Sequence, residues 1–306
     1  GGTVTATGSN NYGAGIGGGG NYYANGGSGG IITISGGSVT AKGGNYGAGI
    51  GGGGNGSNKV GGSGGEIKIS GGTVTATGGK HGAGIGGGST YQGTGGSGGT
   101  IEISGGSVTA QGGDYGAGIG GGGNGAGAGG PGGNIIINNH PTVIATYGTM
   151  GLADIGNGYN NNNTEDTTIK RGDSADLTYI RLEVKNLSHV TGNKITLNEQ
   201  EHEINSDGLT GFFVDKPAGN MNITLNPAGY EAAIVNINPG DVQSSRITLN
   251  ENITIQYEAA TGGTVSRASE TLPSIIGAAQ GSIATANAEY SFANWTNDGV
   301  SVSTET

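Results

Sequence analysis

The feature of this chain that most restricts its fold is an internal repeat in its first half. The repeat unit reads I-x-I-S-G-G-[ST]-V-T-A-x-G-G-x-[YH]-G-A-G-I-G-G-G and is followed by a glycine-rich loop. A unit of nearly constant length, 34 to 36 residues, indicates a stack of similar structural units that pack mainly on their neighbours. The equivalent positions are Val4, Val39, Val74, Val108 and Val143, and Ile16, Ile50, Ile85, Ile119 and Ile155.

Each unit contains two short segments in which apolar and polar residues alternate, for example residues 67–69 and 73–77. Such alternation is typical of strands with one buried face. Helical repeats are excluded, because each unit is rich in glycine, which costs about 1 kcal/mol per helix position. We therefore predict an all-β chain in which residues 1–160 form a parallel β-helix of about five coils. One unit would be one coil, with corresponding strands about 4.8 Å apart.

The repeat also predicts which way each residue points. Valine, alanine and isoleucine of the V-T-A, I-x-I and A-G-I segments should stack inside, and the Gly-Gly pairs should form the corners. Threonine and serine at the alternating positions should form outward columns of hydroxyl groups. If one unit is one coil, Lys68 lies opposite Glu102 on the next coil.

Glycine and charge divide the chain in two. Residues 1–150 hold 59 of the 74 glycines and carry a net charge of +1, whereas the remainder carries a net charge of -11. Because the acidic part has no basic patch, nucleic acid and anionic membrane surfaces are disfavoured as partners. The chain has no apolar run long enough for membrane insertion and no signal-peptide pattern, so we expect any targeting signal or anchor to lie outside it.

Residues 167–250 contain six short segments with strand character, separated by polar turns, which predicts a β-sandwich. These segments are residues 177–184, 194–197, 212–214, 222–225, 233–237 and 246–249. The stretch that contains Asp207-Gly208, Phe212, Pro217-Ala218-Gly219, Ile223-Thr224-Leu225 and Gly229-Tyr230 resembles the carboxypeptidase-regulatory-like and B-type collagen-adhesin modules of bacterial surface proteins.

Residues 251–306 carry a second set of motifs: Gly262-Gly263-Thr264-Val265-Ser266, Gly281-Ser282, Ala284-Thr285-Ala286, Tyr290, Phe292 and Trp295. This set resembles the internalin-type B-repeat, a small β-grasp-like module of Gram-positive surface proteins. That pattern normally continues into one more strand, so we expect an incomplete module and a chain that is part of a longer protein. The glycine-rich unit is similar to repeats of Gram-positive surface proteins and, more loosely, to polysaccharide-binding β-helix proteins. These resemblances imply an extracellular, cell-surface location.

Aromatic residues recur directly before G-A-G-I and should stack along one edge of the β-helix. They are Tyr12, Tyr46, His81 and Tyr115. Aromatic rings bind sugars through apolar contact, so this edge is a candidate carbohydrate-binding site, as are the loop residues Tyr22, Tyr23 and Tyr91. The alternative is that the stacked rings only protect a corner of the coil.

Catalysis on a polysaccharide requires converging carboxylates, or a basic residue with a metal. The coils offer almost none of these groups, and Glu66, Glu102 and Asp114 lie at different repeat positions. We therefore predict no catalytic residues and no enzymatic activity, with a carbohydrate-active lyase or hydrolase as the alternative.

The four histidines lack zinc-binding spacing, and His202 is expected on a solvated strand or turn. We expect no metal and no other cofactor. Calcium stays open as an alternative that the spacing of the acidic residues does not support.

Two short patterns suggest other partners. Arg171-Gly172-Asp173 spells an integrin-binding tripeptide, for which a turn at a domain entrance is the default interpretation. The threonine columns have the regularity of ice-binding arrays, a remote alternative because β-propensity alone also places threonine there. The sequence favours a non-catalytic surface adhesin or polysaccharide-binding protein whose partner is a polysaccharide or a host surface glycan or protein. A structural stalk or spacer is the simplest alternative.

Overall fold

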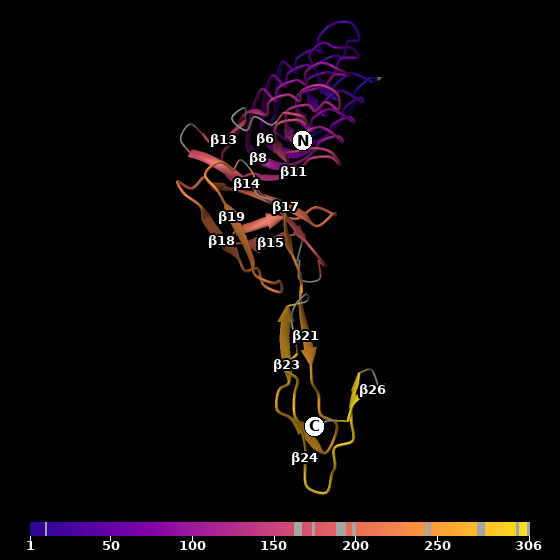
Figure 1. Ribbon diagram of the computed structural model, residues 1–306, viewed down its shortest axis with the longest axis vertical. Helices are drawn as coiled ribbons and strands as arrows, with labels where there is room; N and C mark the ends of the chain where they lie inside the picture. The colour runs from indigo at the N-terminus through magenta and orange to yellow at the C-terminus, as the bar shows by residue number, and fades with distance from the viewer. Residues whose placement is uncertain are drawn as a thin grey trace.

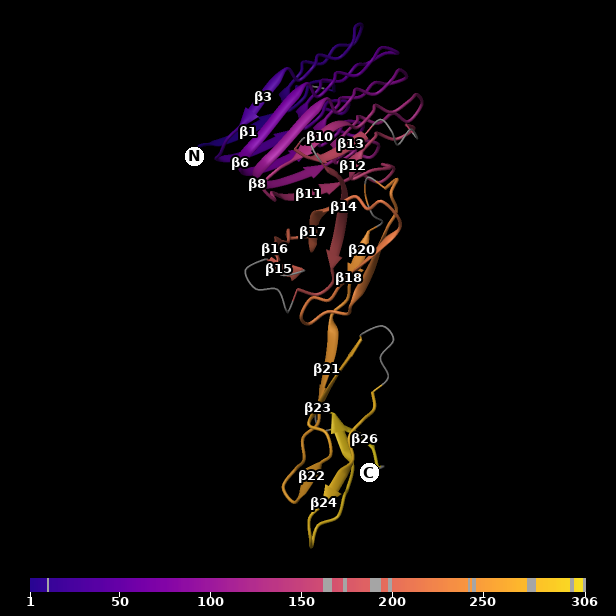
Figure 2. The same ribbon diagram turned by 90° about the vertical axis from the view of Figure 1, so that its left-hand side faces the viewer.

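The computed structural model shows an elongated all-β chain, with no helix among its described residues (Figure 1). The repeats lie at one end of the molecule and the short strand pairs of the last residues at the other (Figures 1 and 2). The structure describes residues 1–9, 11–161, 167–172, 175–187, 194–197, 200–241, 243, 246–273, 279–297 and 300–304.

The repeats form a parallel β-solenoid of about five turns, in which one unit is one coil, as predicted (Figure 2). The V-T-A strands are β1 (Thr3–Thr7), β4 (Ser38–Lys42), the second halves of β6 (Glu66–Thr77) and β8 (Thr100–Gln111), and β11 (Thr142–Thr146). The I-x-I strands are β3 (Ile31–Ile34), the first halves of β6 and β8, β10 (Gly133–Ile137) and β13 (Thr167–Arg171). The A-G-I strands are β2 (Ile16–Gly17), β5 (Ile50–Gly51), β7 (Ile85–Gly86), β9 (Ile119–Gly120) and β12 (Ile155–Gly156).

The predicted register is confirmed, because Lys68 lies opposite Glu102 in the pairing of β6 with β8. The ion pair of Lys68 is nevertheless made within its own strand, with Glu66 at 2.6 Å. Glu102 instead accepts a hydrogen bond from Asn138 at 3.4 Å. The strand register thus follows the sequence repeat. The lysine side chain, however, pairs with Glu66 of its own strand and not with Glu102 of the next coil.

The core of the solenoid is a column of small and β-branched side chains from successive coils. Ile50, Ile85, Ile119 and Ile155 stack on one another and are fully buried. The corner after each of these residues requires glycine: Gly86 has φ +131°, and a Cβ there would collide with the carbonyl oxygen of Gly120. The glycine content of the repeat is therefore a consequence of closely stacked coils.

The solenoid extends further along the chain than the predicted boundary at residue 160. β13, which we had assigned to the second domain, pairs in parallel with β10 and places Ile169 opposite Ile135 in the solenoid core. β13 then turns into the antiparallel strand β14 (Ala175–Val184). The main sheet of the solenoid therefore runs without interruption into the second region.

Side chains of the second region cover the last coil. The Tyr179 hydroxyl accepts a hydrogen bond from the Ala145 amide at 3.0 Å and donates one to the Val143 carbonyl at 3.3 Å. Gln243 forms an isolated β-bridge with Tyr179. Its side-chain Oε1 accepts hydrogen bonds from the amides of Asp154 at 2.7 Å and Ile155 at 3.2 Å. In the middle coils such amides donate to backbone carbonyls of the next coil. Two side chains thus replace the backbone of an absent coil.

The remainder of the second region contains strands at all six predicted positions. β14 pairs with β17 (Leu209–Asp215) and β20 (Ile247–Leu249), and two hairpins join β15 (Lys194–Leu197) to β16 (Gln200–Glu203) and β18 (Met221–Leu225) to β19 (Ala233–Ile237). These elements share a second hydrophobic core that includes Leu182, Leu225 and Val235.

The third region consists of short antiparallel strand pairs, and none of the residues that the structure describes beyond Leu249 is fully buried. Its three two-stranded sheets are β21 (Asn252–Gln256) with β23 (Ser269–Pro273), β22 (Gly263–Val265) with β24 (Ala284–Ala286), and β25 (Trp295–Asn297) with β26 (Val300–Ser303). Within the described ranges, no helix of the length and apolarity of a membrane span occurs.

Candidate functional site

The predicted aromatic ladder forms. The ring centroids of Tyr12 and Tyr46 lie 5.5 Å apart, those of Tyr46 and His81 4.8 Å, and those of His81 and Tyr115 4.6 Å, with interplanar angles of 23°, 7° and 3°. Tyr159 continues the row with an edge contact to Tyr115 at 5.4 Å. The one-coil period thus places an aromatic ring over each preceding ring.

This stacking limits what the inner rings of the ladder can bind. Both faces of Tyr46 and of His81 are covered by neighbouring rings, so that only ring edges reach solvent. Burial lowers the pKa of His81, and the positive charge of Lys80 lowers it further, so the imidazole is neutral near pH 7. The face-on contact that sugars make with aromatic rings is therefore not offered by the inner members.

Free aromatic surface occurs instead beside the first coil, in a group that we call the tyrosine cluster: Tyr12, Tyr22 and Tyr23. The Tyr22 ring meets Tyr12 edge-on at 6.1 Å and Tyr23 at 4.9 Å. Tyr22 is 51% exposed and Tyr23 83% exposed. Gly56 of the next coil packs against the rings of Tyr12 and Tyr22.

Tyr91, the third loop tyrosine predicted from the sequence, is 57% exposed. The Tyr91 phenol lies near Tyr46: burial raises the pKa of Tyr46, and the phenols of Tyr12 and Tyr91 raise it further. The seven predicted aromatic residues therefore group along one edge of the solenoid, with their exposed members on the loops.

The predicted hydroxyl columns also form. In the middle column Thr5 pairs with Thr40, Thr40 with Thr75, and Thr75 with Thr109. The fifth member of this column is Ile144, which is buried rather than exposed. The column becomes apolar at the coil on which the second region packs.

A groove of about 690 Å³ lies where the solenoid meets the second region, and we call it the junction groove. Its solenoid wall comes from the outward faces of β6, β8 and β11 and from the corner that follows each strand, and its other wall comes from the second region. The lining residues with side chains are Thr77, Lys80, Thr109, Gln111, Asp114, Ile144, Thr146, Tyr147, Thr149, Arg181, Asn205, Asp207, Leu209 and Arg246.

A buried ion pair supports this junction. The Arg181 guanidinium bonds the Asp154 carboxylate, and the two side chains are 7% and 3% exposed. The same guanidinium lies over the Tyr147 ring, 5.0 Å from its centroid, and the Tyr147 amide donates to Asp154 at 3.0 Å. Burial raises the pKa of Asp154 to about 6, although Arg181 opposes the shift.

The integrin-type tripeptide lies at the end of β13. The Arg171 side chain bonds the Asp215 carboxylate at 3.1 Å and contacts His140 at 3.2 Å. Gly172 has φ +57°, as a turn glycine does, whereas Asp173 lies outside the described residues. Arg171 is thus held by its own chain.

The predicted histidine and carboxylate candidates lie apart from one another in the residues that the structure describes. There, no group of three or more His, Asp or Glu side chains is placed to hold a metal ion. His202 lies on strand β16 and is partly exposed; its ring packs 5.1 Å from Phe212, and burial lowers its pKa. Asp114 accepts a hydrogen bond from Thr149 at 2.7 Å. His189 lies outside the described residues.

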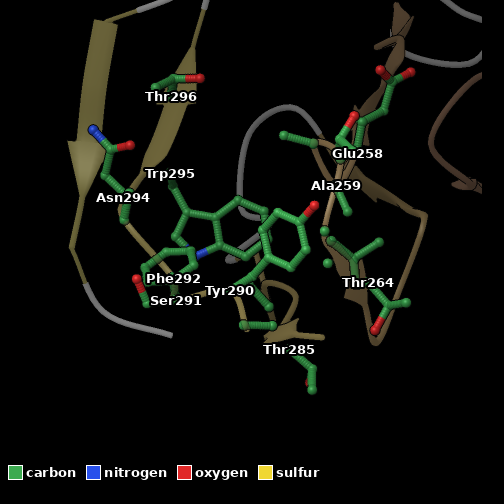
Figure 3. Close-up of a pocket in the computed structure, with 18 residues that line it drawn as sticks. Glu258, Ala259, Thr264, Thr285, Tyr290, Ser291, Phe292, Asn294, Trp295 and Thr296 are labelled. Carbon is green, nitrogen blue, oxygen red and sulfur yellow. The ribbon is translucent and has the colours of Figure 1, made fainter. Parts of the chain in front are cut away.

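The third region carries a further pocket of about 330 Å³, between β22, β24 and β25. Figure 3 shows the rings of Tyr290, Phe292 and Trp295 gathered on one side and Glu258 and Thr264 on the other. Phe292 and Trp295 meet at 5.9 Å. Their positions as module markers were visible in the sequence, but the open pocket between them was not.

Comparison with known proteins matches the repeats alone. The family model described as Beta helix repeat matches residues 1–20, 32–54, 67–89 and 101–123. No curated protein and no solved structure matches the chain. Beta-helix repeats occur in surface adhesins and also in polysaccharide lyases and hydrolases, so the match supports the solenoid without choosing among these functions.

Proposed function

We propose that this protein lies outside the cell, on the surface of a Gram-positive bacterium. There it acts as a non-catalytic polysaccharide-binding protein or adhesin. The observation that carries the proposal is the tyrosine cluster, in which Tyr22 and Tyr23 expose ring surface beside Tyr12, the first ring of the aromatic ladder. A tyrosine ring offers an apolar face to the C–H groups of a sugar and a hydroxyl group to its polar edge.

The ladder contributes rigidity to this site. Tyr12 is held by Tyr46 on one side and meets Tyr22 on the other, so the exposed rings rest on a stacked row. A rigid aromatic anchor loses less conformational entropy on binding than a flexible side chain does. Each ring contact is weak because sugars are well hydrated, so affinity would require several contacts at once.

The non-catalytic form of the proposal rests on the carboxylates of the solenoid. Glu66 is paired with Lys68, and the carboxylates of Glu102 and Asp114 accept hydrogen bonds from Asn138 and Thr149. Asp154, the carboxyl group whose pKa is raised to about 6, is 97% removed from solvent in its pair with Arg181. None of these groups forms the accessible acid and base pair that glycoside cleavage uses.

The surface location and the modular character of the later regions belong to the same proposal. Residues 207–230 and 262–295 resemble modules of Gram-positive surface proteins, which supports a β-sandwich adhesin module followed by a β-grasp-like module. In this arrangement the later regions present the solenoid and its tyrosine cluster away from the cell.

The test is a glycan array probed with the whole chain, followed by titration of the best ligand. We expect the Tyr22→Ala/Tyr23→Ala variant to weaken the Kd by about tenfold or more, which corresponds to about 1.4 kcal/mol. Tyr290→Ala is the matched control, because Tyr290 is equally exposed but lies in the third region. Failure of the whole chain to bind any glycan would overturn the proposal. Release of reducing ends from a polysaccharide would instead establish the enzyme alternative.

A further inference from the structure

We infer that the junction groove is a second glycan-binding subsite, which takes an internal stretch of a neutral polysaccharide. This inference rests on the proposed function and deepens it. It assigns the class of the ligand, a neutral polysaccharide, and the direction in which the sugar chain runs, along the solenoid axis. The groove is twice the size of the aromatic pocket of the third region and opens on the outward face of the solenoid.

The groove has the side-chain chemistry that sugar hydroxyl groups require. Its walls carry one amide and several hydroxyl groups from the solenoid, and an amide and a carboxylate from the second region. These groups belong to Gln111, Thr77, Thr109, Thr146, Thr149, Asn205 and Asp207. The Asn205 amide oxygen already accepts hydrogen bonds from the amides of Asp207 and Leu209, so its NH2 group is the part offered to a sugar, and the Thr149 hydroxyl, which donates to Asp114, is left as an acceptor. Amides and carboxylates bind neighbouring hydroxyl groups through two hydrogen bonds at once. The exposed Tyr147 ring adds apolar surface, as in other small-molecule sites.

The charges of the groove favour a neutral sugar over an acidic one. Arg181 is neutralised by Asp154, and Arg246 by Glu183 at 3.2 Å. Lys80 makes no ion pair within the described part of the chain, but Asp114 and Asp207 lie in the same groove. Glu183 also pairs with Lys185 at 2.6 Å, so the anionic and cationic groups of this set balance, and a carboxylate or sulfate on the ligand would gain no net attraction.

The groove and the tyrosine cluster lie along the same edge of the solenoid, the edge that carries the aromatic ladder, with the cluster at the first coil and the groove at the later coils. Lys80 and Asp114 line the groove and directly precede the ladder residues His81 and Tyr115. The ladder begins at Tyr12 in the tyrosine cluster. Across two to four strand spacings, the two sites are about 10 to 20 Å apart. A linear sugar chain that runs along the solenoid axis can therefore contact both sites, with the gain in affinity that two linked contacts provide.

The repeat supplies a matched pair of variants to test this inference. Thr109 lines the groove, and Thr40 occupies the same outward column two coils earlier, outside the groove. Thr109→Trp fills the groove, whereas Thr40→Trp adds the same ring to an open face. Gln111→Ala and Lys42→Ala form a second such pair in the neighbouring column and avoid any effect of a bulky side chain on folding.

The experiment is titration of the whole chain and these variants with a length series of neutral oligosaccharides taken from the array's best ligand, with polygalacturonate as the acidic comparator. For the unaltered chain we expect affinity to rise steeply once the oligosaccharide spans both sites. Thr109→Trp should remove this rise, a loss of about tenfold or more for the long chains. It should leave the affinity for short ones at the tyrosine cluster, and Thr40→Trp should behave as the unaltered chain does.

Each other outcome overturns a defined part of the argument. If long neutral chains bind Thr109→Trp and Gln111→Ala as tightly as the unaltered chain, the groove is not a subsite, while the proposed function stands on the tyrosine cluster. If polygalacturonate binds better and Lys80→Ala removes that binding, the ligand class is wrong. If the unaltered chain binds no glycan, both the proposed function and this inference fail.

Discussion

The two ends of the solenoid carry the same repeat positions but differ in how those positions are covered. Val4 in the first coil is 49% exposed, whereas its equivalent in the last coil, Val143, is fully buried. Ile16 is only partly buried, whereas Ile155 is fully buried. A coil therefore completes only half of its own core, and the other half comes from whatever lies against it. The second region does this for the last coil.

The largest difference between the two ends is expected at Tyr179. Tyr179→Ala removes a fully buried ring and leaves the Ala145 amide without its acceptor, so we expect the free energy of unfolding to fall by about 4 kcal/mol. Tyr12→Ala in the first coil should cost about 1 kcal/mol, because that ring is only partly buried. Urea denaturation of both variants measures the comparison. Equal losses would show that the cap does not stabilise the solenoid.

Position within the stack should decide the cost of identical core substitutions. Ile119→Ala empties a site enclosed by coils on both sides, and we expect a loss of about 3 kcal/mol. Ile16→Ala changes the same repeat position in the first coil, where solvent fills part of the space, and should cost less than half as much. The same denaturation experiment applies. A larger loss for Ile16 would contradict a core that each coil shares with its neighbours.

The capped end should also respond to pH through Asp154. Its pKa is raised from 3.8 to about 6 by burial, so between these values the folded state binds more protons than the unfolded state. Stability from this group is therefore full below pH 4 and falls as the pH rises toward 6, by about 2 to 3 kcal/mol. Asp154→Asn should remove this component. The check is the difference in unfolding free energy between the two proteins at several pH values, and a constant difference would refute it.

The smallest effect is expected at Gln243. Gln243→Ala deprives the amides of Asp154 and Ile155 of their shared acceptor, at a cost of about 1 kcal/mol. Hydrogen exchange at these two amides should accelerate, while the amide of Ile119, which bonds a backbone carbonyl, should keep its protection. Unchanged exchange at Asp154 and Ile155 would mean that another group satisfies them.

The solenoid could be predicted from the sequence because its contacts join residues one repeat unit apart. The pairing of Lys68 with Glu102 and the stacking of Tyr46 on His81 both follow from that single period. β13 escaped prediction because the T-T-I-K segment lacks the I-x-I-S-G-G pattern of the earlier units, and because a polar run precedes it.

The cap and the junction groove could not be predicted in the same way. Tyr179 lies 34 and 36 positions beyond Ala145 and Val143, about one repeat length, but the V-T-A motif has ended by this point of the chain. Gln243 meets Asp154 and Ile155 from 89 and 88 positions away, and no period in the chain relates them. The seven aromatic candidates were identified, but which of their faces remain free depends on stacking distances. Ile144 was the one available signal, since an isoleucine in a column of threonines marks a covered face.

Ile144 also determines how a protein of this kind can change its length. Duplication of a middle unit would add one strand spacing, about 4.8 Å, and one ring to the ladder, without altering either end. Duplication of the last unit would place a second isoleucine on the outward face with no neighbouring region to bury it. Unequal recombination can therefore lengthen or shorten the rod in whole-coil steps, while the terminal coil is inherited as a single copy.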